Sequence, residues 1–314
     1  MMIHPLATCP GCGGSASTPV DLDGRHELRS CSTCELVYAP EYGEPEEIYV
    51  EGYLTGDTEF GLDLSHPIFQ EFLAWAAGKR LDIIESVRPE RGSLLDVGCG
   101  SGEVLAVAAE RGWETAGAEP VEQSAALARE RGLDVRTALV QHSDLPEGSF
   151  DVVAAFHVLE HVPKGVDFLQ LMGRWAKPGG LVVVEMPNWG SIDRAAKGAD
   201  WPGVRPLEHV AHYTPVTLRR TMERAGLEPV LVRTLGFLWE GQSLGEQLND
   251  LARLRWMRLF RRLSHTTERD GKQEVVPGRL ARALLRGVQA TYDRFGKGQV
   301  VLGIARVPAR VPAE

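Results

Sequence analysis

The stretch Ser93-Leu94-Leu95-Asp96-Val97-Gly98-Cys99-Gly100-Ser101-Gly102 decides how the rest of the chain is interpreted. Its first half is short and apolar, which predicts a buried strand, and its glycines predict a turn. Residues 102–111 then read as a helix whose first backbone N–H groups are available to a ligand. Such a loop alone is weak evidence for a nucleotide site, because Glu103 stands where a dinucleotide-binding G-x-G-x-x-G needs its third glycine.

A second acid stands at the distance that a nucleotide site needs. Residues 114–119 read as the next strand, and Glu119 ends it. An acid at that strand end can accept hydrogen bonds from both hydroxyls of a ribose. Asp96, two residues before the first glycine, and Glu119 together make the glycine loop a candidate nucleotide site.

Four motifs in order resemble the class I S-adenosylmethionine (SAM)-dependent methyltransferases. Residues 95–102 resemble their motif I, and Glu119 matches their ribose-binding acid. Residues 150–162 resemble their fourth strand and the turn after it, and residues 177–180 resemble the turn before their fifth strand. The resemblance covers residues 90 to 235.

The resemblance implies an α/β fold, with a Rossmann-like sheet of seven strands and SAM at the carboxyl ends of the strands. Carried over residue by residue, it implies cofactor contacts from Asp96, Gly98, Cys99, Gly100, Gly102, Glu119, Pro120, Ala138, Leu139, Phe156 and His157. Many members carry an acid after the third strand, where this chain has Thr137-Ala138-Leu139-Val140. We therefore expect backbone and apolar contacts to adenine from Ala138 and Leu139. Cys99 reads as a small loop residue and not as a nucleophile.

The hydrophobic pattern alternates between strands and helices, which predicts a parallel sheet covered on both faces. The expected strands are 93–97, 114–119, 133–137, 150–156, 181–185, 228–233 and 299–307, and the expected helices are 66–87, 102–111, 121–131, 165–176 and 215–225. We divide the chain into a small N-terminal module at 1–40, a linker at 41–63 and a methyltransferase domain at 64–314, with a helical insertion at 240–296.

The N-terminal module carries four of the five cysteines. Cys9-x2-Cys12 and Cys31-x2-Cys34 have the spacing of a zinc ribbon, in which two tight turns direct four thiolates at one structural Zn²⁺. The alternative is two disulfides, which need an oxidising compartment that nothing in the sequence indicates. A segment this small builds too little core to fold alone, so the metal should supply folding free energy.

Methyl transfer to a hydroxyl needs a group that takes the proton, and a nearby histidine suits this role. His209 lies in an insertion after the fifth strand that is rich in aromatics and histidines, and we take it as the leading general base. His157 and His161, in the turn after the fourth strand, are the alternatives, although His161 also reads as an orienting residue. His212 reads equally as a helix-entry residue.

Three functions compete. The first is methyl transfer to a hydroxyl of a small molecule or glycan, in saccharide or natural-product biosynthesis, where members with this cysteine pattern occur. The second is RNA methylation with the ribbon gripping nucleic acid. The net charge of −9 and the few basic residues of the ribbon argue against it, so we expect no nucleic-acid partner. The third is a non-catalytic SAM-binding interaction protein, which the intact motif makes the weakest reading.

The chain has no run of eighteen apolar residues and no secretory pattern at its N-terminus, so we expect a cytoplasmic protein. Residues 251–262 carry five arginines and no acid, beside apolar and aromatic residues. Such a helix can lie on an anionic membrane, which would place the protein at the inner membrane face. The favoured alternative is that its apolar face packs on the sheet. The sequence makes no prediction of the oligomeric state.

Overall fold

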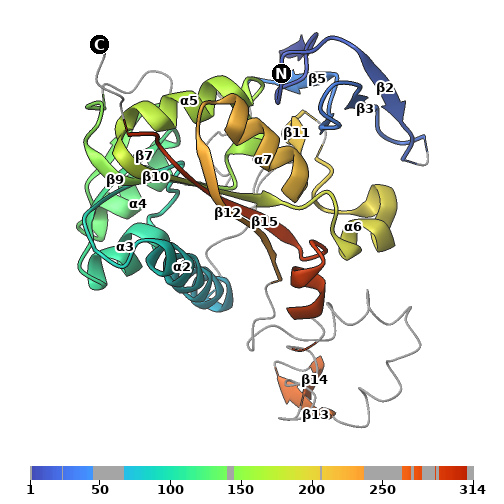
Figure 1. The fold of residues 1–314 in the computed structure, drawn as a ribbon. Helices are drawn as coiled ribbons and strands as arrows, with labels where there is room; N and C mark the ends of the chain where they lie inside the picture. Colours follow the sequence, from blue (N-terminus) through green and yellow to red (C-terminus); the bar gives the residue numbers. More distant parts are fainter. Residues whose placement is uncertain are drawn as a thin grey trace, which may run out of the picture.

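The computed structural model describes residues 2–22, 24–44, 67–139, 145–205, 207–236, 264–269, 272–277, 287 and 290–309. A twisted central sheet of seven strands crosses the molecule, with helices on both faces and a small β module at one end (Figure 1). The order of its strands is β12-β15-β10-β9-β6-β7-β8. The seven-stranded α/β sheet that the motifs imply is thus confirmed.

The strands of this sheet are β6 (Ser93–Val97), β7 (Glu114–Glu119), β8 (Val135–Thr137), β9 (Phe150–Phe156), β10 (Ala176–Pro187), β12 (Glu228–Leu235) and β15 (Val300–Arg306). Strands β10, β9, β6, β7 and β8 are parallel, and β15 runs antiparallel between β10 and β12. Strand β10 is longer than the expected 181–185, because it begins before the glycine turn and continues after a register shift between Ala176 and Leu181.

Side-chain alternation divides the sheet into two apolar faces. On one face, Leu94, Val152 and Val183 pack with helices α2 (Pro67–Val87), α3 (Glu103–Glu110) and α4 (Glu122–Glu130). On the other, Leu95 and Val153 pack with α5 (Gly165–Trp175) and α7 (Pro215–Arg224). The strands are therefore buried on both sides, as continuous apolar runs in a parallel sheet require.

The N-terminal module is a sheet of strands β2 (Ser17–Val20), β3 (Leu28–Cys31) and β4 (Val37–Tyr38), beside which β1 (Ile3–Pro5) pairs with β5 (Glu41–Gly43). Strand β11 (Ala211–His212), from the insertion after β10, joins this sheet by pairing antiparallel with β4. The module also shares an apolar core with α5 and α7, in which Tyr38 and Tyr213 are almost fully buried. Its core is therefore continuous with the core on this face of the central sheet.

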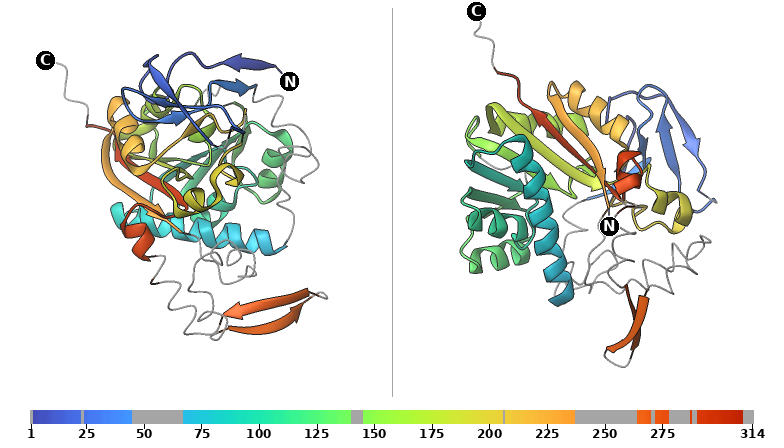
Figure 2. Two further views of the ribbon diagram at one scale, coloured as in Figure 1. Left: turned by 90° about the vertical axis from the view of Figure 1, so that its right-hand side faces the viewer. Right: turned by 60° about the horizontal axis from the view of Figure 1, so that its bottom comes forward.

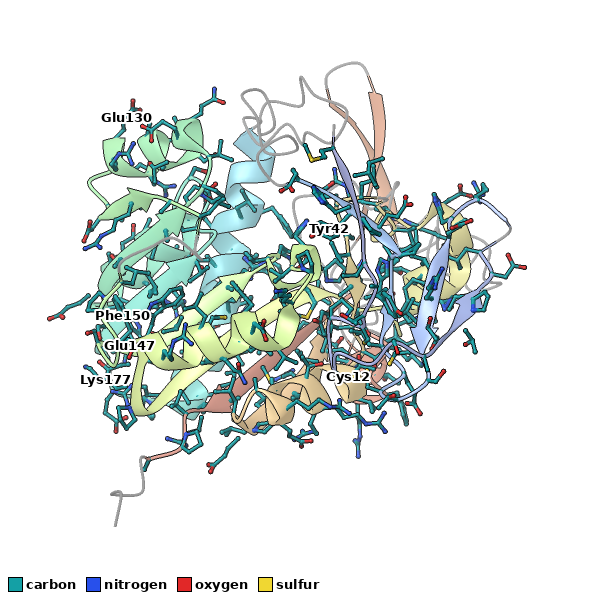
Figure 3. The ribbon with its side chains drawn as sticks, turned by 90° about the horizontal axis from the view of Figure 1, so that it is seen from above. Cys12, Tyr42, Glu130, Glu147, Phe150 and Lys177 are labelled. Atoms are coloured by element: carbon teal, nitrogen blue, oxygen red, sulfur yellow. The ribbon has the colours of Figure 1, made fainter. Side chains whose placement is uncertain are left out.

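The carboxyl ends of the parallel strands face the N-terminal module. In the view from above, Phe150 at the start of β9 and Lys177 near the start of β10 lie at the opposite end from Cys12 of the module (Figure 3). The insertion between β10 and α7 lies at this same module end. It contains α6 (Ile192–Lys197), the 3₁₀ turn η3 (Gly198–Asp200) and β11.

Residues 240–296 differ in part from the expected helical insertion. Strands β13 (Ser264–Arg269) and β14 (Lys272–Pro277) form an antiparallel hairpin, which Figure 2 shows projecting away from the main body. The expectation of helix is wrong for this part, where Thr266-Thr267 and Val275-Val276 supply β-branched residues that favour strands. The basic segment 251–262 lies outside the described residues, as does the expected linker from residue 45 onward. Within the described chain, no helix has the length and apolar character to cross a bilayer.

Candidate active site

The glycine loop after β6 has the backbone conformation that its sequence predicts. Gly98, Gly100 and Gly102 have φ values of +72°, +55° and +82°, a region that residues with a Cβ rarely adopt. Gly98 is also sterically required, because a Cβ there would lie 2.6 Å from Cγ2 of Val158. Helix α3 starts directly after the loop, so its first N–H groups border the same space.

Glu119 connects the end of β7 to this loop. One carboxylate oxygen accepts a hydrogen bond from the Gly100 N–H at 2.9 Å, and the other accepts from the Val121 N–H at 2.9 Å. Desolvation raises the pKa of this buried carboxyl, and the two backbone hydrogen bonds lower it. Each oxygen keeps a further lone pair, so the carboxylate can also accept from a ribose.

Asp96 is buried at the carboxyl-terminal part of β6, and its Oδ1 has no hydrogen-bond partner among the described residues. Desolvation raises its pKa to about 8, although the nearby Arg80 guanidinium opposes the shift. A buried carboxylate oxygen without a partner is costly, which suits an atom that awaits a ligand's cation or donor. The unsatisfied Asp96 oxygen therefore fits a cofactor that places an ammonium group beside the glycine loop.

The remaining expected cofactor residues lie at the same edge of the sheet. Pro120 follows β7, and Ala138 follows β8 with its N–H donating to the Glu119 carbonyl at 3.2 Å. Leu139 is half-buried beside it, and Phe156 ends β9. Cys99 is buried within the loop, where burial raises its thiol pKa, so it is a small packing residue as expected.

A buried ion pair at this edge was not expected from the sequence. Arg80 of α2 donates through Nε to Glu185 Oε1 of β10 at 3.0 Å, and its guanidinium lies 4.6 Å from the centre of the Phe156 ring. Both residues are almost fully buried. The only sign of this ion pair in the sequence is that Arg80 falls on the apolar face of the predicted helix, which also carries Ala77, Leu81 and Ile84.

His157 is held between two carboxylates directly after β9. Its Nδ1 lies 3.3 Å from Glu160 Oε1, its Nε2 lies 3.5 Å from Glu185 Oε1, and its φ is +57°. Its side chain is 43% exposed, and although desolvation lowers its pKa, the contacts with Glu160 and Glu185 outweigh this and raise the pKa to about 9. These two contacts favour the protonated imidazole, whereas a general base must start without the proton.

The structure brings His161 and His209 together with Glu160. His161 and Glu160 belong to the 3₁₀ turn η2 (Leu159–His161), and His209 comes from the insertion. The two imidazole rings are 4.7 Å apart, and one donor atom from each of the three residues lies within 4.8 Å of the others. Desolvation lowers the pKa of His161 to about 3 and also lowers that of His209, so both rings are neutral.

The backbone around His209 is fixed from two sides. The Val210 N–H donates to the Glu160 carbonyl at 2.7 Å, and the Val210 carbonyl accepts from the Ala39 N–H of the N-terminal module at 2.9 Å. His212 is buried in β11 beside Trp189, with ring centres 4.9 Å apart, which is a structural position. Burial lowers its pKa to about 3.

A cavity of about 230 Å³ lies between the N-terminal module and the insertion. Its lining includes Arg25 and Leu28 from the module, and Arg205, His209 and His212 from the insertion. His209 thus contacts this cavity and also approaches the residues after β9. A small molecule in the cavity would contact His209 and His212.

The four N-terminal cysteines converge as the spacing predicts. The Sγ atoms of Cys9 and Cys34 are 3.5 Å apart, as are those of Cys12 and Cys31, and all four lie within 4.8 Å of one another. These separations are far longer than the ~2.05 Å of a disulfide, and all four thiols are free. They match four sulfurs around one tetrahedral ion with bonds of ~2.3 Å, and so fit a zinc ribbon.

Known proteins that are similar in sequence to this chain are methyltransferases. Residues 69–232 match the family model described as "Methyltransferase domain". "Ubiquinone biosynthesis O-methyltransferase" from Azoarcus sp. (strain BH72) is 38% identical over 150 residues, which are 44% of this chain and 64% of that protein. The protein of the same name from Idiomarina loihiensis is 30% identical over 157 residues, 46% of this chain and 65% of that protein. The match therefore spans less than two thirds of each relative's length.

Among solved structures, a SAM-dependent methyltransferase from Archaeoglobus fulgidus is similar in fold, with a TM-score of 0.50 and 20% identity over 76% of this chain and 94% of that one. At this identity the similarity concerns the fold. The family match covers more than half of the chain and includes the glycine loop, Glu119 and the turn after β9. The chain therefore belongs to the methyltransferase-domain family and has the fold of the class I, SAM-dependent enzymes.

Proposed function

We propose that this protein transfers the methyl group of SAM to a hydroxyl of a small-molecule acceptor. The observation that carries the proposal is the pair of buried carboxylates on adjacent strands, Asp96 and Glu119, on either side of the glycine loop. Asp96 would accept from the ammonium of the methionine portion of SAM, and Glu119 would accept from its ribose hydroxyls. Ala138 and Leu139 would contact adenine.

The reaction needs an acceptor oxygen in line with the sulfonium methyl group, and the protein contributes mainly this alignment. As the new C–O bond forms, the C–S bond breaks and its electron pair stays on sulfur. The acceptor's proton must also leave. Removal of this proton depends on the neutral His209 imidazole, which contacts the cavity and the residues after β9. The simplest role of His209 is that of the general base.

The type of acceptor is supported by two observations. Relatives matched over residues of the catalytic domain are named O-methyltransferases, and the cavity beside His209 has both charged and apolar side chains. We propose a hydroxylated metabolite or saccharide within biosynthesis of natural products or glycans. We further propose that one Zn²⁺ bound by Cys9, Cys12, Cys31 and Cys34 is structural.

Replacing His209 tests the role of this residue. His209→Ala should lower turnover by roughly 10²-fold or more, because general acid–base groups contribute 10²–10⁴-fold. SAM affinity, measured by calorimetry, should stay unchanged. Turnover is followed by mass spectrometry of a mixture of hydroxylated acceptors, in which the product gains one methyl group. His4→Ala is the control, since His4 lies in the β1–β5 ladder. Normal turnover of His209→Ala would contradict the proposal.

A further inference from the structure

The cluster of Glu160, His161 and His209 has the composition of a divalent-metal site. The Nε2 of His161 lies 3.9 Å from Glu160 Oε1, and the three donor atoms all lie within 4.8 Å of one another. Two imidazoles and one carboxylate form a set that binds Zn²⁺ and other first-row divalent ions, with coordination positions left for water or substrate. Glu160 and His161 are adjacent on η2, while His209 comes from a distant segment, so the set exists only in the folded chain.

Both histidines are oriented as metal-binding histidines usually are. The Nδ1 of His161 lies 3.1 Å from the carbonyl oxygen of Glu208, and the Nδ1 of His209 lies 2.8 Å from the carbonyl oxygen of Gly203. A carbonyl oxygen only accepts, so in each hydrogen bond Nδ1 carries the proton and Nε2 keeps its lone pair. A backbone carbonyl on the second ring nitrogen fixes the tautomer and raises ligand basicity in many metal sites.

Glu160 provides an independent indication of a cation site. The side chain is 2% exposed, and its Oε2 has no hydrogen-bond partner among the described residues. Its Oε1 lies 3.3 Å from the Nδ1 of His157, which satisfies one side of the carboxylate. An unsatisfied oxygen on a buried carboxylate costs more free energy than an unsatisfied neutral group does. An ion bound by this carboxylate through Oε2, with His161 and His209 as further ligands, would remove this cost.

The cavity between the N-terminal module and the insertion borders this cluster at His209. It has a volume of about 230 Å³ and His209 forms part of its lining. A catalytic metal site, in contrast to a structural one, keeps an open position for a ligand and needs an entry path. The four-cysteine site is of the structural kind, since protein sulfurs alone would complete the coordination of its ion.

We propose that Glu160, His161 and His209 bind one divalent first-row metal ion, distinct from the ion of the four cysteines. Its role rests on the proposed function: the ion binds the acceptor hydroxyl from the cavity and lowers its pKa, because the cation stabilises the oxyanion. The hydroxyl proton passes to solvent water, the C–O bond to the methyl group forms, and sulfur keeps the electrons of the C–S bond. In this metal-bound form His209 is a ligand and not the base.

The test is a titration of the zinc-loaded protein with Co²⁺ alone, without SAM or acceptor. We expect one Co²⁺ per chain beyond the ribbon zinc, with the weak visible absorption of nitrogen and oxygen ligands and without the intense thiolate bands of a four-cysteine site. Glu160→Gln and His209→Ala should each weaken binding about 100-fold or more. His4→Ala should bind normally, since it removes a half-exposed histidine that pairs with Glu44 at 2.5 Å and controls for adventitious imidazole binding.

Two results would overturn the proposal. One is the absence of any Co²⁺ binding beyond the ribbon. The other is binding that persists in both Glu160→Gln and His209→Ala. SAM affinity of the same samples shows whether each variant is folded, and if the buried Glu160→Gln variant fails to fold, His209→Ala decides. Because the titration involves no methyl transfer, its failure would leave the proposed function intact, with His209 as a base.

Discussion

At the scale of single residues, the carboxylates around the glycine loop are buried for different reasons. Glu119 is satisfied by two backbone N–H groups, so it stabilises the loop even without a ligand. Asp96 has one oxygen without a partner in the described chain. The contrast indicates that Glu119 has a structural as well as a binding role, whereas Asp96 is specific to the ligand.

This contrast predicts a pH dependence of SAM binding. Desolvation raises the pKa of Asp96 to about 8 in the free protein, so the carboxyl is mostly protonated below that pH. SAM needs the ionised form, so binding releases a proton and affinity should rise between about pH 6 and pH 8. Calorimetry in buffers of different ionisation enthalpy measures that proton.

Asp96→Asn is the matched variant for this prediction. It keeps the shape of the side chain and removes its titration, so its weaker SAM affinity should not change across the same pH range. An equal pH dependence in the wild type and Asp96→Asn would contradict the assignment of the ammonium to Asp96.

At the scale of elements, the glycines of the loop after β6 are required for two different reasons. Gly98 has both a positive φ and a Cβ position 2.6 Å from Val158, whereas Gly100 has a positive φ but open space around its Cβ position. Gly100→Ala should lower the free energy of unfolding by ~1–2 kcal/mol, the cost of the left-handed conformation. Gly98→Ala should add the cost of overpacking, ~1–3 kcal/mol.

Urea unfolding of the two variants measures this difference. Adding Val158→Ala to Gly98→Ala should remove the clash and restore part of the lost stability relative to the sum of the single changes. If Gly98→Ala and Gly100→Ala were equally stable, the close approach of the loop to Val158 would be wrong.

The N-terminal module and the insertion behave as one element, because β4 pairs with β11 and Ala39 binds Val210. Cys31→Ser should remove the metal, lower the melting temperature and raise amide hydrogen exchange over residues 207–213. Metal analysis and exchange measured by mass spectrometry test both effects. Cys99→Ser lies outside the four-cysteine cluster and should change neither. Unchanged exchange in a metal-free Cys31→Ser protein would contradict the coupling.

The elements that the sequence predicted well depend on local pattern. Strand β6 and strand β9 have the expected bounds, since each is a short apolar run between turn residues. The four-cysteine cluster followed from spacing alone. The pairing of β4 with β11 could not be predicted, because it joins segments far apart in the chain through two residues each. The Arg80–Glu185 pair was missed for the same reason, as neither residue signals its partner.

At the scale of the whole molecule, three sites lie on the side of the sheet where the carboxyl ends of the parallel strands face the N-terminal module. The glycine loop follows β6, the histidine cluster includes the turn after β9, and the four-cysteine cluster lies in the N-terminal module, whose strand β4 pairs with β11 of the insertion. The module therefore supports the insertion that carries His209. This arrangement explains why a class I methyltransferase sheet and a cysteine cluster share one apolar core.

The most direct test of the central claim is a calorimetric titration of the zinc-loaded protein with SAM, in wild type, Glu119→Ala and Glu122→Ala. Glu119 lies at the end of β7 beside the loop, while Glu122 is an exposed acid that binds Arg129 and Thr137. We expect one SAM per chain, an affinity loss of ~1–3 kcal/mol in Glu119→Ala from the lost ribose hydrogen bonds, and no change in Glu122→Ala. A wild-type protein that does not bind SAM, or a Glu119→Ala variant that binds it equally well, would contradict the account.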